Sequence, residues 1–289
     1  MLGILLVHKR FGCTSHDVVN DIRRKFNTRR VGHAGTLDPQ ATGVLVVAVG
    51  PATRFLQYLP LEPKEYRGRI HFGVETTTYD AEGEVVATLP VPSDLKGAID
   101  QALPKFRGLI EQLPPMYSAV KVDGKPLYKY ARQGQELQRE FRRVHIDTFE
   151  ISGDGPERDF RVVCSGGTYI RSLAHDLGQA LGCGAHLSGL QRVAVGRFHI
   201  DDAVAIEDIG PKDLIPLKEA LPPMPLFQVT DGQLSYVREG RAIGMADPPD
   251  VPLVALLDDT GEVFSIARVH GNVLQPECVI PAEVMHGAV

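Results

Sequence analysis

Cysteine, long apolar runs and net positive charge are all scarce in this 289-residue sequence. The cysteines form no Cys-x-x-Cys pair, so the sequence shows neither a zinc site nor a disulfide framework and predicts a reducing, cytoplasmic location. The apolar run at residues 4–7 is too short for a signal peptide or a transmembrane helix, and we expect no membrane association. Internal repeats and a nucleotide-binding glycine fingerprint are also missing. The four cysteines are Cys13, Cys164, Cys183 and Cys278.

The net charge of −5 argues weakly against a nucleic-acid partner, but the charge is unevenly distributed. Residues 1–200 hold 26 Lys and Arg against 21 Asp and Glu, whereas residues 201–289 hold 5 against 15. The average therefore conceals a mildly basic body and an acidic C-terminal region. A basic body is compatible with contacts to nucleic-acid phosphates. An ordinary solvated surface would explain the same charge asymmetry equally well.

Hydrophobic periodicity predicts an α+β fold. Helical spacing follows a Thr14/Asp17 capping pattern and recurs at residues 51–59, 95–103 and 170–181. Strand patterns lie at residues 3–7, 44–49, 66–72, 144–151 and 160–164. Because helices and strands mix without a strict βαβ rhythm, we expect a mixed, mostly antiparallel sheet flanked by helices. A proline-rich boundary near residue 222 and two short strands at 253–257 and 263–269 predict a small C-terminal β-rich module.

The most informative segment is the glycine-rich loop at residues 30–43. Its glycines allow turns that other residues resist, and Pro39 disfavours helical geometry at Asp38. A carboxylate on a shaped loop beside the buried strand at 44–49 suits the presentation of a nucleophile. A plain Asp-Pro turn explains this motif equally well when it is taken alone.

Three further segments combine polar and aromatic residues. Residues 64–67 place Tyr66 at the start of a strand, and residues 166–173 deliver Tyr169 and Arg171 at a strand-to-helix junction. Residues 114–143 interleave tyrosines with lysines and arginines. Each has a structural alternative, because core tyrosines, a surface ion pair and a solvated basic loop would leave the same pattern.

Five motifs in order resemble the TruB family of pseudouridine synthases. The first is Gly-His-Ala-Gly-Thr-Leu-Asp-Pro at residues 32–39, followed by Ala-Thr-Gly-Val-Leu at 41–45. The others lie at residues 64–67, at 115–121 with 127–134, at 167–173 and at 182–186. Together they span most of residues 3–200, and five ordered motifs are far more specific than one.

The resemblance implies the pseudouridine synthase fold and its activity. It implies a catalytic domain over residues 1–222, an RNA-binding insertion at about 114–143, and a PUA-like β module over 226–289. The expected reaction converts the uridine at position 55, in the T loop of tRNA, to pseudouridine. The expected partner is the T loop and stem of tRNA, bound by a monomer. The reaction involves no redox change or group transfer, so we expect no cofactor and no metal.

The same resemblance assigns roles to individual residues. Asp38 is the expected nucleophile, Arg171 its ion-pair partner, and Tyr66 stacks on the target base. Tyr66 is also a candidate for removing the C5 proton, although its ordinary pKa makes it a poor base. The attacked atom, C6 or C1′, stays open. The expected substrate-binding residues are His33, which fills the space left by the extruded uridine, Tyr169, Leu190, Lys9 and Lys121.

The sequence departs from the family at Arg10, where the family has proline, and in its acidic C-terminal region, which weakens the case for RNA binding there. Two other functions compete. A tRNA-folding chaperone would use the same basic segments, at residues 23–30 and 121–143. A nucleoside glycosidase would cleave the same bond, but such enzymes normally pair two carboxylates, and the matched motifs contain only Asp38.

Overall fold

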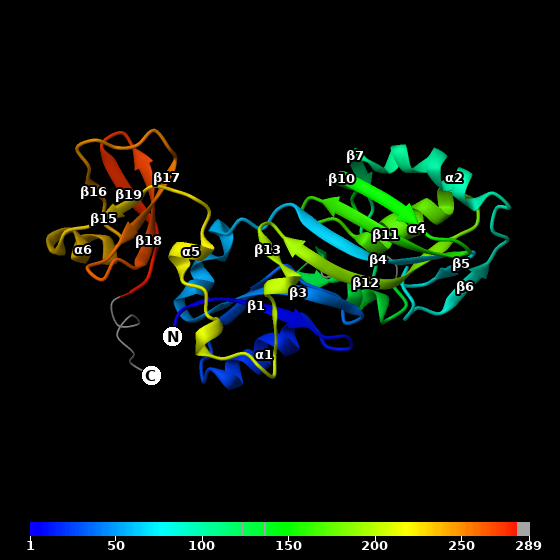
Figure 1. Cartoon of the computed structure of the whole chain (residues 1–289), viewed down its shortest axis with the longest axis horizontal. Coiled ribbons are helices and arrows are strands. Elements are labelled where there is room, and N and C mark those ends of the chain that lie inside the picture. Colours follow the sequence, from blue (N-terminus) through cyan, green and yellow to red (C-terminus); the bar gives the residue numbers. More distant parts are fainter. Residues whose placement is uncertain (119, 123, 136, 282–289) are drawn as a thin grey trace. The chain divides into compact units, whose positions relative to one another are not determined.

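A computed structural model describes residues 1–118, 120–122, 124–135 and 137–281. Three positions of the predicted insertion (119, 123 and 136) and the last eight of the predicted C-terminal module (282–289) lie outside the described residues. The chain divides into two compact units (Figure 1). Unit 1 contains residues 1–39, 44–60 and 201–289, and unit 2 contains residues 40–43 and 61–200. Strand β3 (Ala41–Val49) therefore begins in unit 2 and continues in unit 1.

Outside its C-terminal β-rich part, unit 1 packs helices and short strands around an apolar core. The side chain of Thr14 and the carboxylate of Asp17 form the predicted capping box at the start of α1. Apolar residues of α1 and of strands β1 and β3 form one buried cluster, which fixes the strand that leads out of the glycine-rich loop. Its elements are β1 (Gly3–Lys9), α1 (Ser15–Lys25), β2 (Val31–Ala34), the 3-10 helix η1 (Gly50–Tyr58), β14 (Val204–Ala205), the 3-10 helix η4 (Pro211–Asp213) and α5 (Leu217–Ala220).

The C-terminal part of unit 1 is a five-stranded sheet with the order β15-β17-β18-β19-β16. The two strands predicted at residues 253–257 and 263–269 are its antiparallel core, and their side chains are largely buried. These residues confirm a small β-rich module after the proline-rich boundary. Its elements are β15 (Leu226–Gln228), α6 (Asp231–Arg238), β16 (Ile243–Gly244), β17 (Leu253–Leu257), β18 (Val263–His270) and β19 (Val273–Val279).

Unit 2 is built on the larger sheet. Within it the strand order is β3-β12-β4-β11-β10-β7, and every pair except β3–β12 is antiparallel. The predicted mixed, mostly antiparallel sheet is confirmed, and helix α4 packs against β12. The elements are β4 (Lys64–Phe72), β5 (Val74–Thr76), β6 (Val85–Thr88), α2 (Leu95–Ala102), the 3-10 helix η2 (Leu103–Phe106), β7 (Gly108–Gln112), β10 (Arg142–Ser152), β11 (Glu157–Cys164), α4 (Ile170–Ala180), β12 (Ala185–Val195) and β13 (Phe198–His199). The 3-10 helix η3 (Ile200–Asp202) begins in unit 2 and continues in unit 1.

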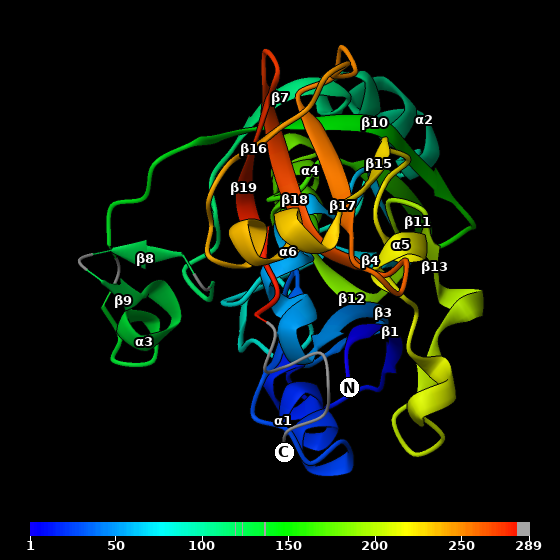
Figure 2. The ribbon, with the colours of Figure 1, turned by 90° about the vertical axis from the view of Figure 1, so that its left-hand side faces the viewer.

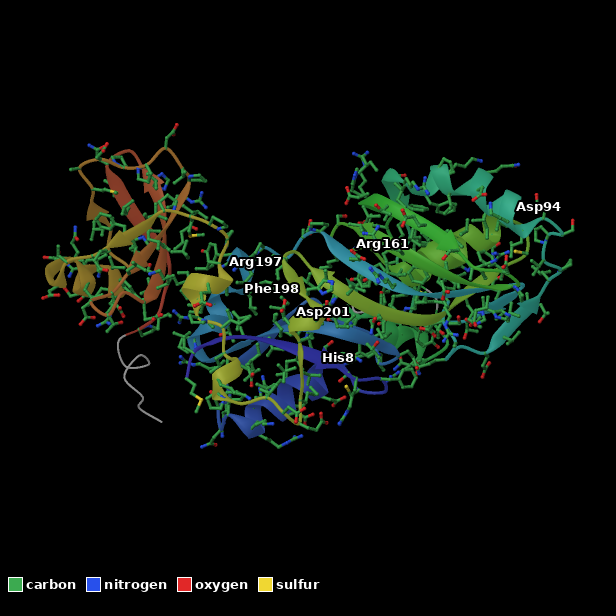
Figure 3. The ribbon with its side chains drawn as sticks, in the orientation of Figure 1. His8, Asp94, Arg161, Arg197, Phe198 and Asp201 are labelled. Carbon is green, nitrogen blue, oxygen red and sulfur yellow. The ribbon has the colours of Figure 1, made fainter. Side chains whose placement is uncertain are left out.

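One predicted helix has a different geometry in the structure, and another has a cap that the periodicity did not predict. The helix expected at residues 51–59 is a 3-10 helix over Gly50–Tyr58. Asp94, labelled in Figure 3, is the N-cap of helix α2, and its carboxylate accepts a hydrogen bond from the Gly97 N–H at 2.9 Å. Within the described part of the chain, no helix has the length and hydropathy needed to cross a membrane.

The basic insertion folds into a small hairpin and one helical turn (Figure 2). They are β8 (Lys121–Val122), β9 (Lys125–Pro126) and α3 (Leu127–Ala131). Leu127 is buried, and the Lys125 ammonium lies over the Tyr130 ring at 4.1 Å. The segment therefore has local order of its own, and Lys121 is exposed on it.

Candidate active site

Asp38 lies in a loop whose two neighbouring residues are both held by hydrogen bonds. On one side, the Leu37 N–H donates to Ser15 Oγ at 2.9 Å, and Ser15 Oγ donates to the Leu37 carbonyl at 3.2 Å. On the other side, the Pro39 carbonyl accepts from the Gly12 N–H at 2.9 Å. Because α1 and the turn before it are part of the unit 1 core, the backbone on both sides of Asp38 is fixed.

Lys9 contributes to the same arrangement. Its side chain is fully buried, and its ammonium donates to the carbonyls of Pro39 (3.2 Å) and Arg10 (3.0 Å). These partners make Lys9 a brace under the loop, and its predicted role in substrate binding stays a prediction. They also hold the Arg10 turn, where the family proline is missing. Cys13 Sγ contacts the same Arg10 carbonyl at 3.2 Å.

The basic stretch at residues 23–30 is partly used inside unit 1. Arg23 donates to the Val31 carbonyl at 3.4 Å, and the Lys25 ammonium donates to the Ile206 carbonyl at 2.9 Å. Arg24 pairs with Asp21. Three basic side chains of this stretch thus have partners inside unit 1. The stretch is therefore weaker evidence for an RNA-binding chaperone than its composition suggested.

Tyr66 and Leu190 lie on neighbouring strands of unit 2. Tyr66 is on β4 and almost completely buried, opposite Arg192 of β12, while Leu190 lies two residues away from Arg192, opposite Gly68. A Cβ at Gly68 would lie 2.0 Å from the Gly189 carbonyl oxygen, so only glycine permits this close strand approach. Arg192 is fully buried, which places a guanidinium beside the strand that carries Tyr66.

Arg171 is the centre of a buried polar cluster in unit 2. Its guanidinium donates to the carbonyls of Tyr117 (2.8 Å) and Thr78 (3.2 Å) and forms an ion pair with Asp80 at 3.4 Å. Both ion-pair side chains are about nine-tenths buried. Asp80 Oδ1 accepts in turn from the Thr78 hydroxyl (2.5 Å) and the Glu82 N–H (3.1 Å). The cluster fixes the guanidinium in position and orientation.

Tyr169 is held through its backbone at the N-terminus of α4. Gln112 Nε2 donates to the Tyr169 carbonyl at 3.0 Å, and the Tyr169 N–H donates to Gln112 Oε1 at 2.7 Å. Ser172 Oγ donates to the Leu113 carbonyl at 2.9 Å. The residues that enter the basic insertion are thus tied to the helix turn that carries Tyr169 and Arg171.

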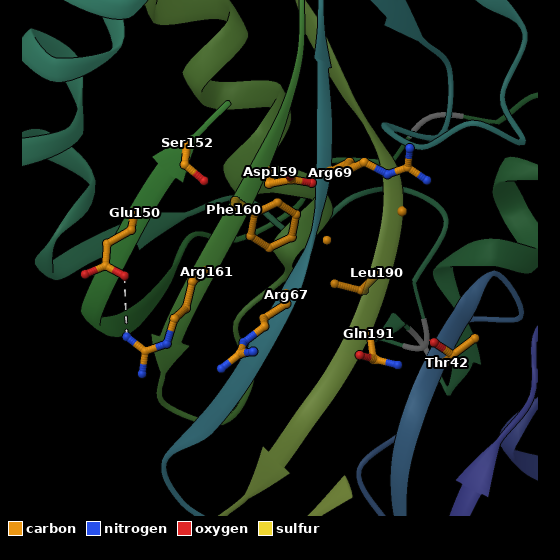
Figure 4. Close-up of a pocket in the computed structure, with 12 residues that line it drawn as sticks. Thr42, Arg67, Arg69, Glu150, Ser152, Asp159, Phe160, Arg161, Leu190 and Gln191 are labelled. Atoms are coloured by element: carbon orange, nitrogen blue, oxygen red, sulfur yellow. Dashed lines mark hydrogen bonds and ion pairs between the residues drawn. The ribbon is translucent and has the colours of Figure 1, made fainter. Parts of the chain in front are cut away.

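A pocket lies over the larger sheet (Figure 4), and Leu190 lines it but Tyr66 does not. It is lined by Arg67 and Arg69 of β4, which alternate with the buried Tyr66 and point to the other side of the strand. Glu65 accepts from Arg161 at 2.9 Å and from Arg67 at 3.3 Å, and Arg161 lowers the pKa of the Glu65 carboxyl. The charged side chains in and beside the pocket are therefore largely paired with one another.

The predicted site residues fall into two sets. Asp38, Lys9 and His33 belong to unit 1, where His33 lies on β2 opposite Val47. The second set, in unit 2, comprises Tyr66, Tyr169, Arg171, Leu190 and Lys121. The structure brings Lys9 to the Asp38 loop, and the pairing of Asp38 with Arg171 stays a prediction. Among the described residues, no group of three or more His, Cys, Asp or Glu side chains is arranged to hold a metal ion.

Family models match residues 23–224, more than two thirds of this chain. A model described as TruB family pseudouridylate synthase (N terminal domain) matches residues 23–170, and one described as tRNA pseudouridylate synthase B C-terminal domain matches residues 171–224. The chain belongs to the TruB family of pseudouridine synthases. This membership confirms the resemblance, the enzyme class and the fold that the motifs predicted.

Full-length relatives share this assignment. A Streptococcus pneumoniae serotype 2 protein called tRNA pseudouridine synthase B is 44% identical to this chain, over 96% of this chain and 99% of the relative. The Mycobacterium bovis protein of the same name is 40% identical, over 98% of this chain and 97% of the relative. The Opitutus terrae protein of that name is 50% identical over 76% of this chain and 95% of its own length.

Solved structures agree. A chain of a Cbf5-Nop10-Gar1 complex matches with a TM-score of 0.69 and 29% identity, covering 99% of this chain and 87% of that one. A chain of an H/ACA RNP bound to a substrate RNA containing 2′-deoxyuridine matches with a TM-score of 0.64 and 26% identity, covering 96% and 85%.

Sequence reasoning missed Asp80. The residue lies outside the five motifs, in the Thr-Tyr-Asp-Ala segment after β5. Its one sequence signal is the turn pattern of an aspartate followed three residues later by Gly83, which is common on protein surfaces. Only its burial against Arg171 separates it from them.

Proposed function

We propose that this chain isomerises the uridine at position 55 of the tRNA T loop to pseudouridine. Family membership supports the reaction class, and the observation that carries the tRNA substrate is the 44% identity to a tRNA pseudouridine synthase B over 96% of the chain. The choice of position 55 rests on the resemblance of the motifs.

In this proposal Asp38 is the nucleophile. The reaction breaks the N1–C1′ bond, turns the uracil and joins C5 to C1′, and a covalent carboxylate adduct divides it into easier steps. The nucleophile must be ionised and correctly oriented, and the hydrogen-bonded backbone at Leu37 and Pro39 supports this orientation. Arg171 supplies the counter-charge that favours the ionised form.

The target base must leave the RNA stack before it can react. Tyr66 would stack on the extruded uracil, with Tyr169 and Leu190 as pocket walls, and His33 would fill the space that the base leaves. Base–aromatic stacking is worth about 1–3 kcal/mol, enough to offset much of the extrusion cost. Tyr66 also stays a candidate for removing the C5 proton.

The basic insertion would contact the phosphates of the T stem and loop. Lys121 is exposed on β8, and neighbouring tyrosines and cations are arranged in local stacks, with Arg132 lying 5.5 Å from the Tyr128 ring centre. Such pairs of aromatic and basic side chains suit RNA loops. We propose that a monomer carries out the whole reaction.

The test uses unmodified tRNA transcribed with 5-tritiated uridine. The proposal predicts stoichiometric tritium release with the wild-type chain, pseudouridine mapped at position 55, and no release at that position from a transcript with cytidine at 55. Modification at another position would refute the site, and free uracil among the products would indicate a glycosidase.

A further inference from the structure

Tyr79 adopts an unusual backbone conformation in the centre of the Arg171 cluster. Its φ is +63°, a region that aromatic residues rarely occupy and that costs about 1 kcal/mol or more. It stands between Thr78, whose carbonyl accepts from Arg171, and Asp80, whose carboxylate pairs with Arg171. Strain of this kind persists where surrounding contacts fix it, and it is concentrated at functional sites.

The ring of Tyr79 is held by helix α4. It stacks on His175 with ring centres 3.8 Å apart and planes 14° apart. His175 Nδ1 lies 3.4 Å from Glu75 Oε1, and His175 follows Arg171 by four residues, so the two side chains lie on the same helix face. Burial raises the pKa of Tyr79 and lowers that of His175, so the stack consists of two neutral rings at neutral pH.

The hydroxyl of Tyr79 points to the basic insertion. Arg139, near the end of the insertion, hydrogen-bonds this hydroxyl and donates to the Pro114 carbonyl at 3.1 Å. Pro114 is at the start of the insertion, and Arg171 binds the Tyr117 carbonyl three residues later. The end of the insertion thus meets Tyr79, whereas its start meets Arg139 and Arg171. All of these residues belong to unit 2.

We propose that Tyr79 is a positioning residue that couples the basic insertion to the Arg171 guanidinium. The Arg139 contact holds the hydroxyl, the His175 stack holds the ring, and the backbone on either side of Tyr79 supplies two of the groups that orient Arg171. RNA held by the insertion would thereby keep Arg171 in its reactive position. The inference rests on the proposed function, since it assigns RNA to the insertion and a catalytic role to Arg171.

Two substitutions separate the ring from the hydroxyl. Tyr79→Asn removes the ring but keeps a residue that tolerates positive φ, and Tyr79→Phe removes only the hydroxyl. We measure tRNA affinity, thermal stability and the single-turnover rate at saturating tRNA. We expect Tyr79→Asn to lower the rate at least about tenfold and Tyr79→Phe about threefold, with tRNA Kd within about twofold of wild type.

Tyr58→Phe is the matched control, because it removes a tyrosine hydroxyl that lies 3.4 Å from Glu277 in unit 1. Wild-type rates for Tyr79→Asn, or a loss confined to affinity, would overturn the inference. If Tyr79→Asn does not fold, the decision rests on Tyr79→Phe, Arg139→Gln and their double variant. A double loss no larger than the larger single loss supports coupling, and additive losses refute it. A wild-type chain that forms no pseudouridine refutes the proposed function instead.

Discussion

The Asp38 loop of unit 1 and the Arg171 cluster of unit 2 hold their central groups in different ways. The loop is fixed through the main chain, by Lys9, Gly12 and Ser15 acting on the carbonyls and N–H of the residues beside Asp38. The cluster is fixed through the side chain itself, because the guanidinium binds an acid and two carbonyls directly.

The difference matches the chemistry proposed for each group. The place of a nucleophilic carboxylate depends on the backbone that carries it, and hydrogen bonds of the residues beside Asp38 fix that backbone. A guanidinium has five donors and can spend several on orientation while others face the reaction. Substitutions should therefore have different effects in the two regions.

Asp38→Ala should have the largest effect on activity. Because its neighbours carry the hydrogen bonds that fix the loop, the fold and tRNA affinity should survive, while isomerisation falls by more than about a thousandfold. Tritium release and tRNA binding measure the two quantities. Asp21→Ala, which removes the α1 partner of Arg24, is the control with retained activity. Near-normal release from Asp38→Ala would refute its role as nucleophile.

Asp80→Ala should damage stability as well as activity. It leaves the Arg171 charge buried without its carboxylate, and breaking a buried ion pair costs about 3–5 kcal/mol. Urea unfolding gives the free energy. Asp100→Ala is the control, since its ion pair with Lys96 is exposed and worth less than about 0.5 kcal/mol. Equal losses from the two variants would contradict the comparison.

Asp176→Asn tests α4 through pH. Burial raises the pKa of the Asp176 carboxyl from 3.8 to about 6, so between these values the folded state keeps a proton that the unfolded state has lost. Stability should therefore fall as pH rises through this window. Asp176→Asn should be more stable than wild type by up to about 3 kcal/mol at pH 7.5, with this advantage shrinking towards zero at pH 4. An advantage that is equal at both pH values would disprove the link.

Lys121→Ala should have the smallest effect. Removal of one exposed phosphate contact should weaken tRNA binding severalfold at low salt and reduce the slope of log K against log salt by about 1. Lys9→Met is the matched comparison, because this buried ammonium braces the loop. It should leave the salt slope unchanged and lower stability instead. A reduced slope for Lys9→Met would support the predicted role of Lys9 in substrate binding.

Local patterns predicted most of the fold. The capping box at Thr14, the apolar run of β3 and the amphipathic face of α4 each depend on residues within one or two turns, and each lies where its pattern placed it. The 3-10 geometry of η1 was not predicted, because apolar spacing over nine residues does not distinguish short helices of different pitch.

The sequence by itself determined the family, the glycine-rich loop around Asp38 and the strand and helix that carry Tyr66 and Arg171, because these depend on ordered motifs and local periodicity. Only the tertiary structure decided that Lys9 is a buried brace and that Asp80 and Tyr79 surround Arg171. These contacts join residues about 30 to 95 positions apart. Burial strengthens each of these polar contacts and makes an unpaired group costly. Burial of residues so far apart in the sequence arises only when the chain folds, so local sequence patterns do not predict it.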